Sequence, residues 1–134
     1  MKRMSIGTAL TVTLALTALV SLAAQAPAFK RTVLQQVALS TPSLEAVMAR
    51  AEFPAGTETG RHTHPGEEIS IVEAGPFILE VDGQPAKTLQ TGEVFSIPKG
   101  TIHNGHPAPG GTAKILATYV IDKGKPVSAP APAK

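Results

Sequence analysis

The chain has 134 residues, with 12 lysines and arginines against 10 aspartates and glutamates, and it contains no cysteine. This length supports one domain with a single hydrophobic core. The lack of cysteine excludes a disulfide scaffold, a thiolate zinc cluster, a cysteine nucleophile and a lipid-anchored lipoprotein, so any metal must bind to His, Asp or Glu side chains. A net charge of +2 favours an anionic partner only if the excess basic residues lie in the folded domain.

The first 28 residues have the pattern of a secretory signal peptide, with a cleavage site expected between residues 23 and 28. Lys2 and Arg3 precede an almost continuous run of Ala, Leu, Val and Thr from Ile6 to Ala24, and small residues follow it. The alternative is an uncleaved membrane anchor, because about 18 apolar residues can span a bilayer. Both interpretations predict an exported protein, periplasmic or secreted, which contacts a membrane only if the leader is retained.

The excess of basic residues belongs to this leader. Without Lys2 and Arg3, the chain carries 10 basic and 10 acidic residues. It also has no cluster of lysines and arginines with interleaved aromatic residues, which is the usual footprint of nucleic-acid binding. We therefore expect a neutral domain that does not bind nucleic acid.

Residues 29–123 are predicted to form one all-β domain. From Pro42 to Pro107, prolines recur every 9 to 13 residues, usually beside a glycine, and turns at this spacing separate short strands. The expected strands are 31–38, 45–53, 68–73, 77–81, 86–90, 93–97, 101–106 and 115–121. Helix is the alternative for Leu44–Ala51. Residues 124–134 are rich in proline and alanine and are predicted to be a disordered tail.

The strand predicted at 115–121 is apolar on both faces. Isoleucine, alanine and tyrosine residues at its odd-numbered positions alternate with Leu116, Thr118 and Val120. A strand of this kind is normally covered on both sides. We therefore expect it to lie against a second sheet or a partner subunit.

Three of the four histidines lie in two short segments whose spacing indicates a metal site. Residues two apart on a strand face the same side, so the side chains of His62 and His64 are expected to lie next to each other. A turn then allows Glu68 to return to the same ion as a carboxylate ligand. A second turn, containing proline and glycine, brings His103 from a distant strand.

Three imidazoles and one carboxylate suit one divalent transition metal (iron, manganese, nickel, copper or zinc) better than calcium or magnesium. Around an octahedral ion, four protein ligands leave two positions open, as a reactive site requires. The sequence does not distinguish among these metals, because the same ligands accept all of them.

These residues lie in two motifs that resemble those of the cupin superfamily, G-x5-H-x-H-x3-E-x6-G and G-x5-P-x-G-x2-H-x3-N. The first motif is matched at Gly56, His62, His64, Glu68 and Gly75. The second is matched at Gly92, Pro98, Gly100 and His103. Its last position holds Pro107, where the family has an Asn that is not a metal ligand, and Asn104 is a candidate for that residue's turn-stabilising hydrogen bond.

The resemblance implies a fold, an assembly and a set of functions. The implied fold is the double-stranded β-helix, a jelly-roll barrel with the metal inside one mouth. A homodimer is also implied, for which strand 115–121 offers a buried edge or an interface.

Resemblance to the quercetin-dioxygenase-like cupins implies a small metal-dependent oxygenase-type enzyme. Its substrate would chelate the metal through oxygen atoms, and Glu68 would be a candidate proton acceptor as well as a ligand. The alternative is a non-catalytic module that binds a metal or a small ligand for sensing or sequestration. A sugar isomerase or epimerase is a third possibility, since the fold alone does not determine function.

Several neighbouring residues are expected to lie outside the ligand set. The candidates for the wall of the pocket are Phe77, Phe95 and Tyr119. Glu67 is expected to face away from the metal, because it alternates with a ligand on its strand. Arg61 is interpreted as a solvated charge and His106 as a loop residue.

Overall fold

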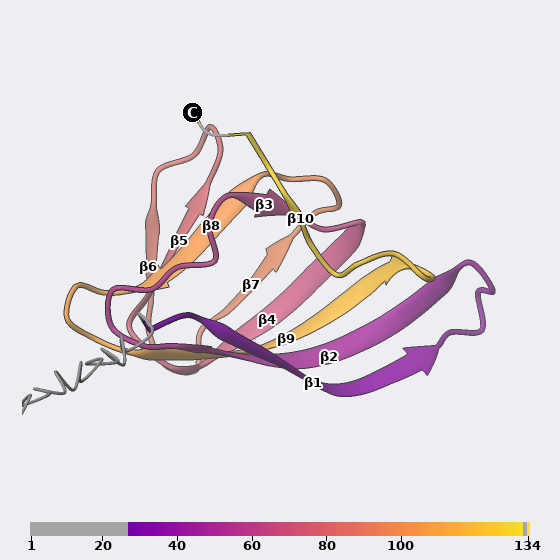
Figure 1. Ribbon diagram of the computed structural model, residues 1–134, viewed down its shortest axis with the longest axis horizontal. Helices are drawn as coiled ribbons and strands as arrows, with labels where there is room; N and C mark the ends of the chain where they lie inside the picture. The colour runs from indigo at the N-terminus through magenta and orange to yellow at the C-terminus, as the bar shows by residue number, and fades with distance from the viewer. Residues whose placement is uncertain (1–26, 133) are drawn as a thin grey trace, which may run out of the picture.

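The computed structural model describes residues 27–132 and 134, so residues 1–26 of the predicted leader lie outside the described part. The described residues form ten β-strands and no helix, which confirms the all-β prediction. That part of the chain accordingly contains no helix of the length and apolarity needed to cross a membrane. The strands make two five-stranded antiparallel sheets that face each other (Figure 1).

The first sheet has the strand order β1-β2-β9-β4-β7. These strands are β1 (Lys30–Ala38), β2 (Leu44–Phe53), β9 (Ala113–Asp122), β4 (Gly66–Ala74) and β7 (Val94–Ile97). The second sheet has the order β10-β3-β8-β5-β6. Its strands are β10 (Ala129–Pro130), β3 (His62–Thr63), β8 (His103–Pro107), β5 (Phe77–Val81) and β6 (Lys87–Leu89). From β3 onwards the chain repeatedly crosses between the sheets, which rolls them into one barrel.

Alternating burial explains why residues 44–53 form a strand instead of the alternative helix. In β2, Val47, Ala49 and Ala51 point into the core, whereas Met48 and Arg50 face outwards. This period of two matches a strand packed on one face. Helix propensity is therefore overridden by the apolar surface that β2 buries between the sheets.

Strand β9 lies at the centre of the first sheet, between β2 and β4. Its inward residues, including Ile115, Tyr119 and Ile121, are buried against the second sheet. Its outward residues Leu116 and Val120 remain half-buried. The prediction of cover from a second sheet is thus confirmed for one face, whereas the prediction of a buried edge is wrong because β9 has a paired strand on each side.

The C-terminal segment, residues 124–132, corrects the prediction of a disordered tail. It crosses from the end of β9 to the second sheet, where β10 pairs with β3 (Figure 1). The backbone N–H of Ala131 donates to the carbonyl oxygen of Arg61 at 2.9 Å, and Val127 packs against the core. Proline and alanine cannot build a core of their own, but they can add a short edge strand to an existing sheet.

A glycine fixes the distance between β4 and β9. Gly66 is paired with Ile121, and a Cβ atom at its position would overlap the carbonyl oxygen of Val120. Glycine is therefore required for this close approach of two backbones. Two residues later, Glu68 is held on the inner face of β4, opposite Tyr119 on β9.

Candidate metal centre

The three motif histidines and Glu68 come together between the two sheets. His62 on β3 is directly opposite His103 on β8, and His64 follows just after β3. The backbone N–H of Gly100 donates to the carbonyl oxygen of His64 at 3.0 Å, which ties the turn before His103 to the first motif. One nitrogen of each histidine lies within 4.8 Å of the corresponding nitrogens of the other two. All four side chains are buried.

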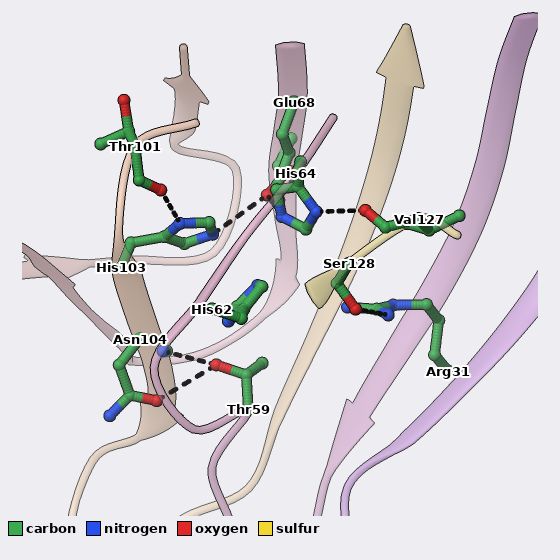
Figure 2. A network of polar contacts seen from close by, with 12 residues as sticks. Arg31, Thr59, His62, His64, Glu68, Thr101, His103, Asn104, Val127 and Ser128 are labelled. Carbon is green, nitrogen blue, oxygen red and sulfur yellow. Dashed lines mark hydrogen bonds and ion pairs between the residues drawn. The ribbon is translucent and has the colours of Figure 1, made fainter. Parts of the chain in front are cut away.

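Each histidine is oriented by a backbone carbonyl group at its Nδ1 atom. The acceptors are the carbonyl oxygens of Gly60 for His62 (2.8 Å), Val127 for His64 (2.6 Å) and Thr101 for His103 (2.9 Å). Figure 2 shows the bonds of His64 and His103. Because a carbonyl oxygen only accepts, the bonded Nδ1 must carry the proton. Each neutral imidazole then presents an unprotonated Nε2 atom, the state that a metal ligand needs.

With the three imidazoles neutral, their Nε2 atoms and Oε2 of Glu68 lie close together as hydrogen-bond acceptors, while Oε1 of Glu68 accepts from the Ser70 hydroxyl. Nε2 of His64 is buried and has no hydrogen-bond partner, although Oε2 of Glu68 lies 2.9 Å away. Nε2 of His103 lies 3.5 Å from the same oxygen. Two ligands bound at right angles to one ion, each at about 2.1 Å, lie about 3 Å apart. The residues therefore fit a divalent transition metal, which would satisfy all of these lone pairs together.

Burial and the neighbouring charges set the protonation of the site. Burial lowers the pKa of His62 to about 4, against the opposing effect of its hydrogen bond to the carbonyl oxygen of Gly60. Burial by itself raises the pKa of Glu68, but hydrogen bonds from His103, His64 and Ser70 outweigh it and hold that pKa well below its usual range. The bonds from the two histidines require a proton on Nε2, and a bound metal ion would take the place of those protons. Near neutral pH, His62 is therefore a neutral imidazole whose unprotonated Nε2 can bind a metal, and Glu68 is an ionised carboxylate.

A small cavity of about 30 Å³ adjoins this ligand set. The predicted wall residues Phe77, Phe95 and Tyr119 all line it, together with His62 and Glu68. Burial, reinforced by the charge of Glu68, raises the pKa of Tyr119 well above its usual range. Tyr119 therefore remains a neutral phenol, which can donate a hydrogen bond but does not act as an anionic ligand.

The other predicted residues lie outside this set. Glu67 is exposed on β4, as predicted from strand alternation. Arg61 is not simply solvated, because its guanidinium forms a two-pronged ion pair with Asp82. The loop prediction for His106 is wrong, since this residue lies on β8, where Nδ1 is 2.9 Å from the carbonyl oxygen of Pro107. In the described residues, His106 does not belong to the histidine cluster.

Asn104 ties the loop before β3 to the second sheet. Its buried amide donates to Glu58 at 2.6 Å and to Glu80 at 3.1 Å, and its carbonyl oxygen accepts from Thr59. The Thr59 hydroxyl in turn accepts from the backbone N–H of Gly105 at 3.0 Å. This network is consistent with the turn-stabilising role considered for Asn104.

Sequence reasoning missed three residues at the site. Arg31 of β1 lines the cavity, and its Nη1 donates to Ser128 at 3.1 Å (Figure 2). Val127 supplies the carbonyl oxygen that orients His64. A backbone carbonyl leaves no sequence signal, because every residue has one. The signal at Arg31 was a charged residue at the start of the first predicted strand, but nothing local showed that this strand would reach the site.

Comparisons with known proteins agree with this fold. Residues 49–119 match the cupin domain family. Germin-like protein 1-1 of Oryza sativa subsp. japonica is 33% identical over 78 residues, covering 54% of this chain and 36% of that protein. The chain thus spans only about a third of this curated relative.

Solved structures show the same architecture. A Klebsiella pneumoniae protein with a double-stranded β-helix domain superimposes with a TM-score of 0.64 at 16% identity, covering 82% of this chain and 90% of that one. An oxalate oxidase in complex with glycolate superimposes with a TM-score of 0.55 at 23% identity, covering 63% and 45% of the two chains. The two facing antiparallel sheets, the paired histidine motifs and the match over residues 49–119 together show that this chain belongs to the cupin domain family and folds as a double-stranded β-helix.

Proposed function

We propose that this protein is a metal-dependent enzyme of oxygenase type that acts on a small substrate able to chelate the metal through oxygen atoms. The observation that carries this proposal is the convergence of unprotonated histidine nitrogens and the Glu68 carboxylate beside a cavity. Four protein ligands around an octahedral ion leave positions for substrate and a further small molecule. When bound, a divalent transition metal supplies Lewis acidity and, for a redox-active ion, activation of dioxygen.

The residues of this chain divide into ligands and walls. His62, His64 and His103 would hold the ion through Nε2, and Glu68 through Oε2, while Ser70 donates to the other carboxylate oxygen of Glu68 at 2.6 Å. With Oε2 directed at the ion and Oε1 accepting from Ser70, this geometry favours Glu68 as a ligand over its role as a proton acceptor. The aromatic wall excludes water and positions the substrate.

The size of the cavity favours a second candidate function, a binding module without turnover. A cavity of about 30 Å³ has room for about one water molecule, so a ligand must be very small or must extend beyond the cavity. A metal-binding or small-ligand-binding protein needs no more space than this. Turnover therefore has to be measured separately from binding.

The proposal is tested with purified protein lacking residues 1–28. The protein is loaded with one equivalent of iron, manganese, nickel, copper or zinc, and oxygen uptake is followed with phenols, flavonols and keto acids while products are identified by mass spectrometry. We expect oxygen uptake and a product with at least one redox-active metal, both lost in His103→Ala. Ligand binding without product for every metal would instead support the binding module.

We also propose export and self-association. The leader pattern at 1–28 supports export, and release of the mature protein into the periplasm or medium, measured by N-terminal sequencing, tests it.

Exposed apolar residues on the outer face of the first sheet support a homodimer. They are Ile69, Ile71, Val94 and Met48.

A further inference from the structure

Arg31 reaches from the edge of the first sheet to the mouth of the metal cavity. It lies near the start of β1, paired in register with the buried Ala51 on β2. Its guanidinium carbon lies 5.4 Å from the ring centre of Phe29 and 5.6 Å from that of Tyr119. Nη1 donates to the Ser128 hydroxyl at 3.1 Å, as Figure 2 shows. These contacts hold the guanidinium in a defined orientation.

One nitrogen of this guanidinium has no hydrogen-bond partner. Nε of Arg31 is buried and makes no hydrogen bond. The other two arginines in the described residues differ, because Arg50 forms a two-pronged pair with Glu73 and Arg61 with Asp82. No carboxylate within the described part of the chain forms an ion pair with Arg31. A buried N–H donor on a permanently charged group is destabilising unless it donates a hydrogen bond to an acceptor, and an anion is the most favourable one.

The position of Arg31 connects the metal site with solvent. It lines the inner cavity together with His62, Glu68 and His103. It also lines an outer groove of about 230 Å³ together with His62 and Ser128. A molecule entering from the groove towards the histidines therefore passes Arg31. Among the described residues, Glu68 is the only carboxylate that lines the cavity. With a divalent ion bound, it would face two positive centres, the ion and Arg31, so one further negative charge on the ligand suits the site.

We propose that Arg31 recognises a carboxylate group of the substrate, and that the substrate is a small carboxylic acid whose neighbouring oxygen atom can reach the metal. A carboxylate is planar and accepts two parallel hydrogen bonds from one edge of a guanidinium. A compact cation such as a lysine ammonium does not present two donors in this fixed planar arrangement. This inference rests on the proposed metal site and narrows its substrate class. It assigns to Phe29 and Ser128 the role of positioning residues, since they act by holding Arg31.

The test measures ligand binding to protein loaded with cobalt(II), whose visible absorption reports changes at the ion. The probes are glycolate and its neutral analogue glycolamide, titrated into the wild type, Arg31→Met, Arg31→Lys and the control Arg50→Met. We expect glycolate to bind roughly 10- to 100-fold more weakly to Arg31→Met, because a hydrogen bond to a charged group is lost. Arg31→Lys should restore part of the affinity, and Arg50→Met should behave as the wild type.

Several outcomes would overturn the proposal. The proposal would be wrong if glycolate bound equally well to the wild type and to Arg31→Met. It would also be wrong if Arg31→Met weakened the binding of glycolamide as much as that of glycolate, because a packing role of Arg31 would affect both probes alike. Lack of glycolate binding by the wild type would also overturn it.

Failure of the proposed function has a different signature. Cobalt content below one equivalent in the wild type would contradict the metal site itself. Arg31-dependent glycolate binding without any turnover would support this inference and would contradict only the proposed enzyme activity.

Discussion

At the scale of single residues, the three histidine ligands are oriented by backbone carbonyl groups, whereas Glu68 is held by the Ser70 side chain. Each histidine donates from Nδ1 to a carbonyl oxygen, which fixes both its tautomer and its ring orientation. Loss of His64 or His103 would leave Glu68 buried with fewer partners and the ion with fewer ligands. His106, although only three residues beyond His103, takes no part in this arrangement.

Elemental analysis of single variants checks this assignment. We expect His64→Ala and His103→Ala to lower the bound metal from one equivalent to a small fraction of it, because a tight site needs all of its protein ligands. His106→Ala is the matched control and should retain the full equivalent. An equal loss of metal in all three variants would mean that the ligands are misassigned.

Gly66 permits a second prediction at the same scale. Gly66→Ala should lower the free energy of unfolding by about 3 kcal/mol, because the added methyl group meets the backbone of β9, which cannot move without disturbing the ladder. Urea denaturation measures the change. Gly111→Ala is the control, since the nearest atom to its Cβ position is 3.3 Å away and its backbone has no positive φ; it should change the free energy by less than about 1 kcal/mol. Equal effects would contradict the close approach of β4 and β9.

At the scale of elements, the C-terminal segment completes the site from outside the two motifs. Its Val127 carbonyl orients His64 and its Ser128 hydroxyl orients Arg31. Hydrogen-bond partners of metal ligands typically contribute 10- to 100-fold in metal affinity. This edge segment thus contributes to a site in the middle of the barrel through the Val127 backbone and the Ser128 side chain.

Truncation tests this contribution. A chain that stops after Lys123 should bind metal roughly 10- to 100-fold more weakly in a competition titration with a chelator, because His64 loses its acceptor. A chain that stops after Pro130 keeps Val127 and Ser128 and should bind metal as the full chain does. The far-ultraviolet circular dichroism of both proteins shows whether the barrel is intact. Unchanged affinity in the shorter chain, with an intact barrel, would contradict the role of Val127.

At the scale of the whole molecule, the outer face of the first sheet is more apolar than a solvated face needs to be. Ile69 is 59% exposed and Val94 is 69% exposed. Ile71 and Val94 are paired in register, so their side chains form a continuous strip across β4 and β7. Contiguous apolar surface of this kind favours association with another protein surface.

Sedimentation at micromolar concentration tests the proposed homodimer. The wild type should sediment with twice the mass of the mature chain, and Ile69→Lys should shift it towards the monomer, because burying an unpaired charge in the interface is unfavourable. Gln84→Lys, on the turn between β5 and β6, is the control and should remain dimeric. A wild type that sediments as a monomer would contradict the proposal.

The sequence predicted the longer strands and the proximity of His62 and His64 because both depend on local pattern. Alternation of apolar residues indicated β2 and β9, and the spacing of His62 and His64 placed two rings on one face. The position of the C-terminal segment could not be predicted in this way. Its proline- and alanine-rich composition indicates that it cannot build a core, but it does not indicate which strand it pairs with. Arg31 was missed for the same reason, since only the closure of the barrel brings β1 to the cavity.

The contact between His64 and Val127 also orders the assembly of the site in time. The two residues are 63 positions apart in the chain, and Arg31 and Ser128 are 97 apart. A nascent chain that has been synthesised only as far as β9 already contains every ligand, yet His64 still lacks the acceptor that fixes its tautomer. Full metal affinity is therefore expected only after Val127 has been made and β10 has docked.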